Sequence, residues 1–287
     1  MECRRIVEQP LVSIVTPSYN QGAFIEQTIL SIRNQTYPNI EHIIVDGGST
    51  DATLDVIRKH EGTYNMRWLS EPDKGAADAI NKGFDMARGE IVTWINSDDI
   101  YVASDAVEKV VEAFRAYPAA DIVAGDGIYM HQNGRWLYSA AHWRKSRACY
   151  KHLRYTNSLI QPSTFFRRHV VEDCRCDITF HYAFDWDLFV CMARKYNVLP
   201  IDDIIAGFRI HPAQKGGATT GFAAAAREIT RRHLGAPSPQ YALLTFYHGL
   251  FRATDLLPRP LRIPIQQGLS KLSAIITALT FRRVASV

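Results

Sequence analysis

The sequence lacks several features that would assign it quickly to one class of protein. Its 287 residues contain no run of about 18 consecutive apolar residues, the length a helix needs to span a bilayer. It has only five cysteines, none in a Cys-x-x-Cys pair, so we expect neither a disulfide framework nor a zinc site. This cysteine usage favours the reducing cytoplasm. The two arginines within residues 1–10 are followed by no apolar stretch, so no secretory signal is expected.

An excess of charge of one sign is also missing. The 33 Lys and Arg residues nearly balance the 29 Asp and Glu residues, and the net charge of +4 is too small to indicate a nucleic-acid partner. Hydrophobic residues make up 47% and charged residues 22%, average values that exclude a disordered chain. No G-x-G-x-x-G follows the first apolar run, which argues against a dinucleotide-binding dehydrogenase.

What the sequence does contain is an alternation of short β-type runs with helical periodicity through its first half. The predicted strands cover residues 11–16, 40–45, 66–69, 90–95 and 121–124, and the predicted helices cover residues 21–35, 49–60, 75–88 and 104–117. Ser49 or Thr50 is expected to cap the second of these helices. The alternation implies right-handed crossovers and a mainly parallel mixed sheet covered by helices on both faces. The predicted fold class is therefore α/β.

The second half of the sequence is less regular. A hairpin is predicted over residues 129–138 around Asn133-Gly134, followed by a strand at 163–167 and a helix at 185–196. Residues 198–211 are predicted to hold two short strands, with helical stretches after Pro212. Prolines near residue 237 mark the expected boundary between a main domain of residues 1–235 and a basic helical tail of residues 236–287.

Four polar loops follow predicted strands, at residues 16–20, 46–49, 71–75 and 96–99. Because the carboxyl ends of parallel strands meet at one edge of a sheet, the four loops together predict a ligand site there. Each loop taken alone has an ordinary surface loop as its alternative. In the last loop, the adjacent carboxylates of Asp98 and Asp99 repel each other unless a cation such as Mg²⁺ or Mn²⁺ compensates. The alternative is that one of them caps the following turn and the other is solvated.

Three stretches of this sequence resemble the family 2 inverting glycosyltransferases. The opening of that family is similar to VSIVTPSYNQGAFIEQTILSIRNQTYPNIEHIIVDGGSTDAT, and its next stretch is similar to EPDKGAADAINKGFDMARGEIVTWINSDD. A later acidic motif of the family is similar to FDWDLF. The resemblance covers about residues 11–212 and implies the GT-A fold, with a nucleotide-binding half over residues 1–125 and an acceptor-side half over residues 126–235.

The resemblance implies a binding site for a nucleoside-diphosphate sugar, a UDP-sugar in the commonest members. The implied donor-binding residues are Thr16, Pro17, Tyr19, Asn20, Asp46, Lys74, Asp78, Asn81, Asn96, Ser97 and Asp98. Asp46 would hydrogen-bond the base, and Lys74 would meet a phosphate as a point charge. Asp98, Asp99 and His211 are the implied ligands of Mn²⁺ or Mg²⁺, although an ordinary loop position is the alternative for His211. The chain departs from the family pattern at Asn96, where many members have an aspartate.

The resemblance places the catalytic base at Asp185. Inversion in one displacement needs a carboxylate that accepts the proton of the attacking hydroxyl. Capping of the helix that follows is the alternative role for Asp185, and the two roles are compatible. The implied acceptor-side or loop residues are Gln161, Trp186, Asp187 and Lys215, with core packing as the alternative for Trp186. Phe184 and Cys191 stand where many members have an acid and an arginine.

The implied activity is metal-assisted transfer of a sugar to a hydroxyl of a glycan or lipid-linked acceptor in surface polysaccharide synthesis. Because the chain departs from the family pattern at Asn96, Phe184 and Cys191, the alternative is a catalytically impaired nucleotide-sugar-binding scaffold of a glycan assembly complex. A nucleotidyltransferase is disfavoured because no Gly-rich phosphate loop with a basic residue lies near the N-terminus. A processive synthase is disfavoured because the sequence has no Q-x-x-R-W motif.

Positive charge is concentrated in the C-terminal part of the sequence. From residue 227 onward, nine Lys and Arg residues face two acids, a local charge of +7 that leaves −3 for the rest. Apolar segments at residues 241–251 and 272–281 are flanked by basic residues, a pattern typical of helices that lie on an anionic membrane surface. We expect either peripheral contact with the inner face of the plasma membrane, or packing on the main domain or on a second subunit of a homodimer.

A chain ending at residue 236 tests the membrane expectation. It loses six basic residues and one acid, and each basic residue near an anionic surface contributes about 1 kcal/mol of attraction. We expect the shortened chain to float less than the full chain with vesicles containing phosphatidylserine, and the difference to shrink at high salt. Neutral phosphatidylcholine vesicles are the control. Equal flotation of the two chains with anionic vesicles contradicts the membrane role.

Overall fold

The computed structural model describes residues 9–139, 153–154, 157–211 and 219–234, together with residues 261 and 265. The chain divides into two compact units, Met1–Gln214 and Lys215–Val287. The first unit holds the sheet, and the second holds helix α8 (Thr219–Leu234). Lys215 and the predicted tail segments at 241–251 and 272–281 lie outside the described residues, so the boundary at 235/236 stays a prediction. Over the described part of the chain, no helix combines the length and apolar character that a membrane crossing requires.

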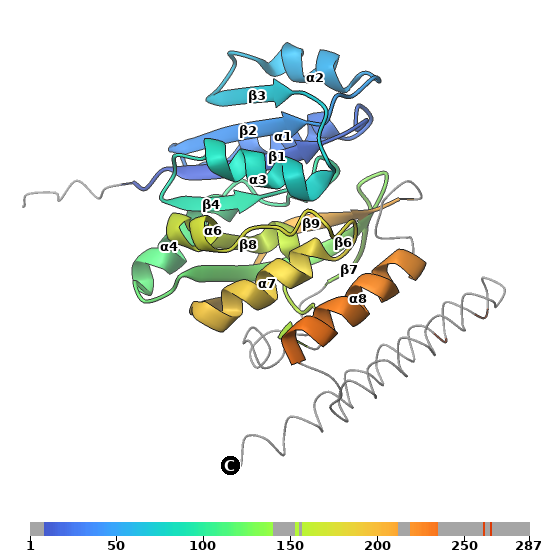
Figure 1. Cartoon of the computed structure of the whole chain (residues 1–287). Coiled ribbons are helices and arrows are strands. Elements are labelled where there is room, and N and C mark those ends of the chain that lie inside the picture. Colours follow the sequence, from blue (N-terminus) through green and yellow to red (C-terminus); the bar gives the residue numbers. More distant parts are fainter. Residues whose placement is uncertain are drawn as a thin grey trace, which may run out of the picture. The chain divides into compact units, whose positions relative to one another are not determined.

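A mixed sheet organises the first unit (Figure 1). Within the described residues it has nine strands in the order β3-β2-β1-β4-β8-β6-β9-β5, with β7 paired to β6. The strands are β1 (Val12–Ser18), β2 (Ile40–Asp46), β3 (Met66–Ser70), β4 (Ile91–Trp94), β5 (Ile100–Tyr101), β6 (Ile122–His131), β7 (Trp136–Ser139), β8 (Thr164–Arg167) and β9 (Val198–Ile210). Strands β3, β2, β1 and β4 run parallel, whereas β8 is antiparallel to both of its neighbours. The predicted α/β class with a mixed sheet is confirmed.

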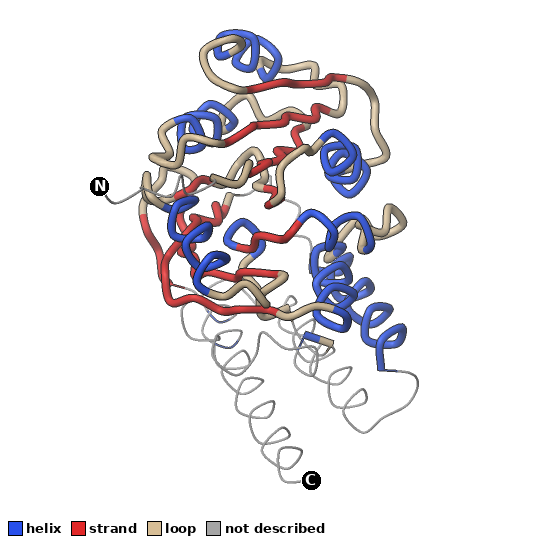
Figure 2. Tube along the Cα trace, turned by 90° about the vertical axis from the view of Figure 1, so that its left-hand side faces the viewer, coloured by secondary structure: helices blue, strands red, loops and turns tan. Residues whose placement is uncertain are grey.

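Helices cover both faces of this sheet (Figure 2). They are α1 (Ile25–Arg33), α2 (Thr53–His60), α3 (Ala76–Met86), α4 (Ala106–Ala116), the 3₁₀ turn η2 (Gln161–Ser163), α6 (Arg168–Asp173) and α7 (Phe184–Lys195). Val12 and Ile14 of β1 pack in one buried cluster with residues of α1 and α4. Side chains alternate along a strand, so Val15 faces the other way, where it meets Gly83 of α3. Trp94 stacks on Phe189 of α7 at 5.8 Å, so α7 covers the same face as α3.

Several predicted boundaries differ from the structure. Residues 198–211 were expected to form two strands, but β9 is continuous because it pairs with β6 along most of its length and with β5. The short strand β5 and helix α6 had no clear periodicity in the sequence. The predicted cap of α2 by Ser49 or Thr50 is wrong, because α2 begins at Thr53 and the Ser49 hydroxyl bonds Asp46 instead.

The expectation that the chain has no disulfide is also wrong. Cys174, at the end of α6, is bonded to Cys191 in the middle of α7. The two residues are 17 positions apart with no motif spacing, and only the packing of α6 and α7 brings their Cα atoms to 6.3 Å. Cys191, which stands where many family members have an arginine, therefore links α7 covalently to Cys174. The free thiol of Cys176 is buried.

Candidate functional site

Asp46, at the end of β2, is the centre of a buried hydrogen-bond cluster. Its Oδ2 accepts hydrogen bonds from the backbone N–H groups of Gly48 at 3.0 Å and Ser49 at 2.8 Å. The Ser70 hydroxyl donates to the same oxygen at 2.8 Å, and the Ser49 hydroxyl donates to Oδ1. The sharp turn at Gly48 has φ +83°, which favours glycine. Asp46 thus fixes the loops that follow β2 and β3 against each other.

The loop after β1 is bonded to the same cluster. The backbone N–H of Asn20 donates to Ser49 Oγ at 2.7 Å, and the N–H of Thr50 donates to Asn20 Oδ1 at 2.9 Å. Asn20 has φ 52°, a left-handed conformation that asparagine tolerates. Thr16 is buried, with its hydroxyl 2.9 Å from His42 Nε2, whereas Tyr19 is 60% exposed. Pro17 is buried in the strand, whereas Tyr19 and Asn20 are both exposed to solvent.

The loop after β3 leads into α3. Lys74 is exposed, and its backbone N–H donates to Asp78 Oδ2 at 3.1 Å. Lys82 Nζ lies 3.7 Å from the same carboxylate. The amide of Asn81 bonds the backbone of Cys176, accepting from its N–H at 3.0 Å and donating to its carbonyl at 2.8 Å. Asn81 therefore attaches α3 to the segment before α7.

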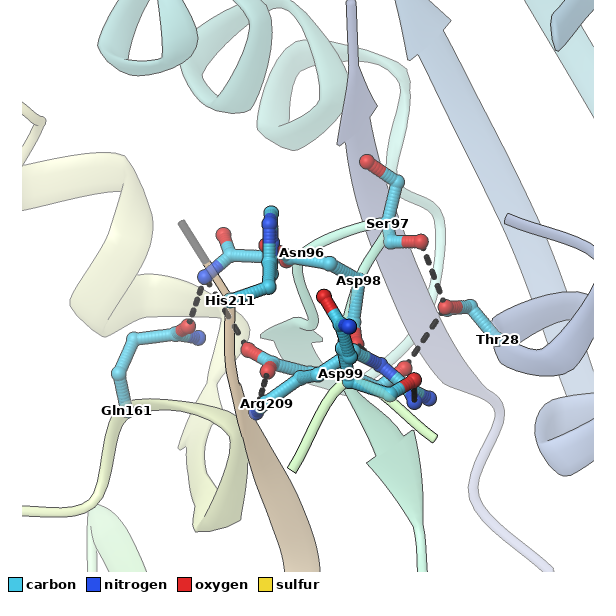
Figure 3. Close-up of polar contacts among 9 residues, drawn as sticks. Thr28, Asn96, Ser97, Asp98, Asp99, Gln161, Arg209 and His211 are labelled. Carbon is cyan, nitrogen blue, oxygen red and sulfur yellow. Dashed lines mark hydrogen bonds and ion pairs between the residues drawn. The ribbon is translucent and has the colours of Figure 1, made fainter. Parts of the chain in front are cut away.

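A second cluster forms around residues 96–99, directly after β4 (Figure 3). Asp98 Oδ2 lies 2.9 Å from Nε2 of His211, which follows β9. The imidazole of His211 is almost fully buried and packs against the ring of Phe24, with centroids 4.6 Å apart. On the other side, Thr28 Oγ1 lies 2.9 Å and 2.7 Å from the carbonyl oxygens of Ser97 and Asp99. Helix α1 and strand β9 thus hold the loop between them.

Asp98 and Asp99 are separated by their surroundings. Asp99 is 1% exposed, and its Oδ1 accepts a hydrogen bond from the backbone N–H of Arg209 at 2.8 Å. Burial, followed by the charge of Asp98, raises the pKa of Asp99 well above its ordinary value. The side chain of Asp98 is 19% exposed. Asp98 is therefore the member of the pair that is able to meet a ligand, and Asp99 is turned into the protein.

Arg209 is the buried cation beneath this cluster. Its Nε donates to the carbonyl of Asp98 at 2.6 Å, Nη1 donates to the carbonyl of Gln132 at 2.9 Å and Nη2 donates to Gln27 Oε1 at 2.8 Å. The guanidinium also lies 5.2 Å from the centre of the Phe24 ring, a cation–π contact. Burial lowers the pKa of Arg209 below its ordinary value, and the charges of Asp99 and Asp98 offset only part of this effect.

Asn96, the departure from the aspartate of the family pattern, is held by amide contacts. Its Nδ2 donates to Gln161 Oε1 at 3.1 Å and lies 3.3 Å from Asp99 Oδ2. Gln161 in turn donates from Nε2 to the carbonyl of Trp94 at 2.7 Å. These contacts occupy the amide nitrogen of Asn96, so its Oδ1 is the atom left to accept a further hydrogen bond. Gln161, predicted on the acceptor side, thus lies beside the 96–99 loop.

The chain provides two groups suited to a divalent cation, the carboxylate of Asp98 and the imidazole of His211. Within the described ranges, His, Cys, Asp and Glu side chains form no group of three or more that could hold a metal ion. Mg²⁺ and Mn²⁺ are commonly held by one or two protein ligands together with phosphate oxygens of the substrate. The exposed oxygen side of Asp98 fits such a cation, whereas the inward carboxylate of Asp99 does not.

Asp185 lies in the first turn of α7. Its Oδ2 accepts a hydrogen bond from Asn157 Nδ2 at 3.0 Å, and burial raises its pKa. The helix begins at Phe184 after Ala183, so the alternative role of Asp185, capping the helix, is wrong. Trp186 is 1% exposed and donates from Nε1 to the carbonyl of Leu153, as its core-packing alternative requires.

Tyr129 of β6 connects the two acidic regions. Burial, the neighbouring Tyr138 and the charges of Asp99 and Asp185 raise the pKa of Tyr129 to about 12. The charges of Asp99 and Asp185, which are 86 positions apart in the sequence, therefore both raise the pKa of Tyr129. Asp187 is also buried in the first turn of α7. Burial, with a smaller contribution from the charges of Asp185 and Asp187, raises the pKa of the Cys176 thiol.

Sequence reasoning missed several residues of this site, among them Thr28, Phe24 and Asn157. Thr28 falls on the apolar face of α1, and a hydroxyl on such a face was the available signal for a buried polar contact. Phe24 gave no signal beyond its helical spacing. Asn157 lies outside every predicted element, and its contact with Asp185 depends on the tertiary fold.

The family described as "Glycosyl transferase family 2" matches residues 13–175. The chain belongs to this family. Among curated relatives of this family 2 chain is the "Putative teichuronic acid biosynthesis glycosyltransferase TuaG" of Bacillus subtilis, 41% identical over 137 residues, which are 47% of this chain and 53% of TuaG. The chain spans about half the length of the curated relatives it matches.

Solved structures show the same fold as this family 2 chain. TarS 1–349 of S. aureus in complex with UDP-GlcNAc has a TM-score of 0.64 at 19% identity, covering 86% of this chain and 73% of TarS. The mannosyltransferase PcManGT of Pyrobaculum calidifontis, in complex with GDP-Man and Mn²⁺, has a TM-score of 0.63 at 19% identity, covering 98% and 81%. The implied GT-A fold is thereby confirmed.

Replacing Arg209 by Met tests how much the 96–99 loop depends on this cation. Removing one partner of a buried ionic cluster costs about 3–5 kcal/mol, so the free energy of unfolding is expected to fall by that amount in urea titrations. Arg209→Lys is expected to recover little, because one ammonium group cannot reach three acceptors on different segments. The control is Arg115→Met on the exposed side of α4. A change in Arg209→Met no larger than in the control contradicts the role.

Proposed function

We propose that this protein transfers a sugar from a nucleoside-diphosphate sugar, with a UDP-sugar as the first donor to test, to a hydroxyl of a glycan or lipid-linked acceptor, with inversion. Membership of family 2 supports a glycosyltransferase activity. TuaG is named for teichuronic acid biosynthesis, which supports a place in surface polysaccharide synthesis. The TarS and PcManGT complexes contain nucleotide sugars and, in one of them, Mn²⁺.

The observation that carries the proposal is the pairing of Asp98 with His211. These residues are 113 positions apart, and their side chains meet at 2.9 Å beside the strand-end loops. A carboxylate and an imidazole in contact, with the carboxylate partly exposed, are suited to hold a divalent cation against a diphosphate. Asp46, Asn96, Ser97 and the side chains of Tyr19 and Lys74 are proposed to complete the donor site.

On the donor side, Asp98 and His211 would hold Mn²⁺ or Mg²⁺, and such a cation would supply positive charge to the departing diphosphate. Residues of the chain itself hold the loops of the site in place. The Asp46 cluster keeps the loops after β1, β2 and β3 in one arrangement before the donor arrives. Arg209 and Thr28 hold the backbone of residues 97–99 in place. Such preorganisation removes the cost of ordering these loops during the reaction.

On the acceptor side, Asp185 is proposed as the general base. The acceptor oxygen attacks the anomeric carbon on the side opposite the diphosphate, the bond from that carbon to the diphosphate oxygen breaks, and the hydroxyl proton passes to the Asp185 carboxylate. Asn157 donates to Oδ2 of this carboxylate at 3.0 Å, which holds the side chain in place. A raised pKa makes the carboxylate a stronger base than an ordinary aspartate.

The exchange Asp185→Asn tests the base. It keeps the shape of the side chain but removes the proton acceptor, so turnover is expected to fall by at least about 10²-fold while donor affinity is retained. Because burial raises the pKa of Asp185, the wild-type rate should fall as the pH drops through that raised pKa, above the ordinary range of an aspartate, where the base becomes protonated.

Release of nucleoside diphosphate from a panel of nucleotide sugars measures this turnover. Asp105→Asn, a half-exposed carboxylate before α4, is the matched control. A wild-type rate in Asp185→Asn ends the assignment. A wild-type protein that binds nucleotide sugars with Mn²⁺ but turns over none with any acceptor is instead the impaired scaffold.

The exchange Asp98→Ala tests the metal-assisted donor site. We expect it to abolish the gain in UDP or GDP affinity that Mn²⁺ provides, since the carboxylate supplies the charged protein ligand. His211→Ala should reduce the same gain, and Asp105→Ala should leave it intact. Calorimetric titrations with and without Mn²⁺ measure the effect. An unchanged Mn²⁺-dependent affinity in Asp98→Ala would show that the site lies elsewhere.

We also propose that the protein works at the inner face of the plasma membrane, where lipid-linked acceptors are made. The charge of +7 from residue 227 onward supports this location. The flotation experiment with the chain ending at residue 236 tests it. A second copy of the chain as the partner of the tail is the other outcome, which would appear as a change of oligomeric state in the shortened chain.

A further inference from the structure

Three aromatic rings form a continuous row across three neighbouring strands. Phe208 of β9 is paired with Tyr129 of β6, and Tyr129 is paired with Tyr138 of β7. The ring centroids of Phe208 and Tyr129 are 5.6 Å apart, and those of Tyr129 and Tyr138 are stacked at 4.7 Å. Tyr138 is 55% exposed, so the outer ring of the row is open to solvent. Nothing in the proposed mechanism uses this aromatic row.

The aromatic row borders the candidate site through β9. Phe208 directly precedes Arg209, whose backbone N–H bonds Asp99. Successive side chains of a strand point to opposite faces, so Phe208 lies on the face opposite the Arg209 guanidinium. That guanidinium packs over Phe24 next to α1, which leaves Phe208 on the face covered by α3 and α7. The aromatic row and Asp185 therefore belong to the same face of the sheet.

The aromatic row also borders the site through β6. A Cβ on Gly127 would lie 2.7 Å from Cγ2 of Ile160, so the strand runs against the residue that precedes Gln161. The segment before Gln161 also holds Asn157, whose Nδ2 donates to the Asp185 carboxylate at 3.0 Å. The row thus begins near the proposed base and ends at the exposed ring of Tyr138.

The chemistry of the aromatic row fits a sugar ring. A pyranose presents flat faces of C–H groups and a rim of hydroxyls. The exposed ring of Tyr138 offers a flat apolar face, and its hydroxyl both donates and accepts hydrogen bonds. Strand β7 also exposes Trp136 and Leu137, at 59% and 39%, in the two positions before Tyr138.

We propose that Phe208, Tyr129 and Tyr138 form a binding platform for a pyranose unit of the acceptor glycan, next to the unit whose hydroxyl reacts at Asp185. This assignment rests on the proposed function and adds to it that the acceptor is a saccharide recognised beyond its reacting residue. The exposed ring of Tyr138 makes the contact, and the two rings behind it hold that ring at the sheet surface.

Steady-state kinetics of Tyr138→Ala test the platform. The acceptor is the oligosaccharide that gives the fastest turnover in a screen of bacterial cell-envelope oligosaccharides. Loss of one stacking ring, about 0.5–1.5 kcal/mol, should raise the acceptor KM roughly 2- to 12-fold. The kcat, the donor KM and the slow hydrolysis of donor by water should stay unchanged. Tyr138→Phe should keep the wild-type acceptor KM within about twofold.

Tyr117→Ala is the matched control, because Tyr117 is 58% exposed at the end of α4, away from the row. An unchanged acceptor KM in Tyr138→Ala overturns the platform. So does a KM that rises equally in both alanine variants, since the effect would then be unspecific. Melting temperatures show whether any loss reflects unfolding.

A binding measurement separates failure of the platform from failure of the proposed function. Saturation-transfer NMR from the aromatic protons is recorded with methyl pyranosides of glucose, galactose, mannose and N-acetylglucosamine. We expect the ring C–H protons of at least one of them to be saturated by the wild type and by Tyr117→Ala, but not by Tyr138→Ala. No saturation by the wild type overturns the platform even where turnover is found. Saturation without any turnover supports the platform and contradicts the enzyme.

Discussion

The hydrogen bond from the Arg209 N–H to the Asp99 carboxylate ties together the two halves of the sheet at the site. It joins the loop after β4 to β9. Strand β4 belongs to the parallel half of the sheet (β3, β2, β1 and β4), and β9 belongs to the mixed half (β8, β6, β9, β5 and β7). Because His211 is only two residues beyond Arg209, the same bond sets where the imidazole meets Asp98. A carboxylate kept inside the protein is costly, and the buried guanidinium of Arg209 offsets that cost. The pairing of Asp98 with His211 therefore depends on a hydrogen bond between two buried residues, Arg209 and Asp99.

The two acidic residues of the 96–99 loop differ in exposure and in the role that each is suited to. Asp99 serves the fold, since its oxygens face the Arg209 backbone and the Asn96 amide. Asp98 keeps an exposed side. Asn96, which removes one charge from the family pattern, is a fixed part of the loop because Gln161 holds its amide nitrogen. This arrangement explains how the site keeps its shape with one carboxylate fewer.

Much of the parallel half could be predicted from the sequence, because strand and helix periodicity are local properties. The strands β1 to β4 and the polar loops that follow them are where the apolar runs and their ends place them. The mixed half was harder, since β9 owes its continuity to pairing with β6 and β5. Within the site, the inward turn of Asp99 and the disulfide of Cys174 with Cys191 depend on contacts between distant segments. No spacing in the chain encodes them.

Asn81 gives helix α3 a second duty. The helix starts at the loop of Lys74, on the side proposed for the donor, and Asn81 in its middle bonds the backbone of Cys176 on the way to α7. Its 11 residues make a rod about 16 Å long at 1.5 Å per residue. The helix therefore joins the loop proposed to bind the donor to the segment that leads to Asp185, the proposed base. A substitution that tilts α3 would therefore change the distance between the Lys74 loop and the segment that contains Cys176.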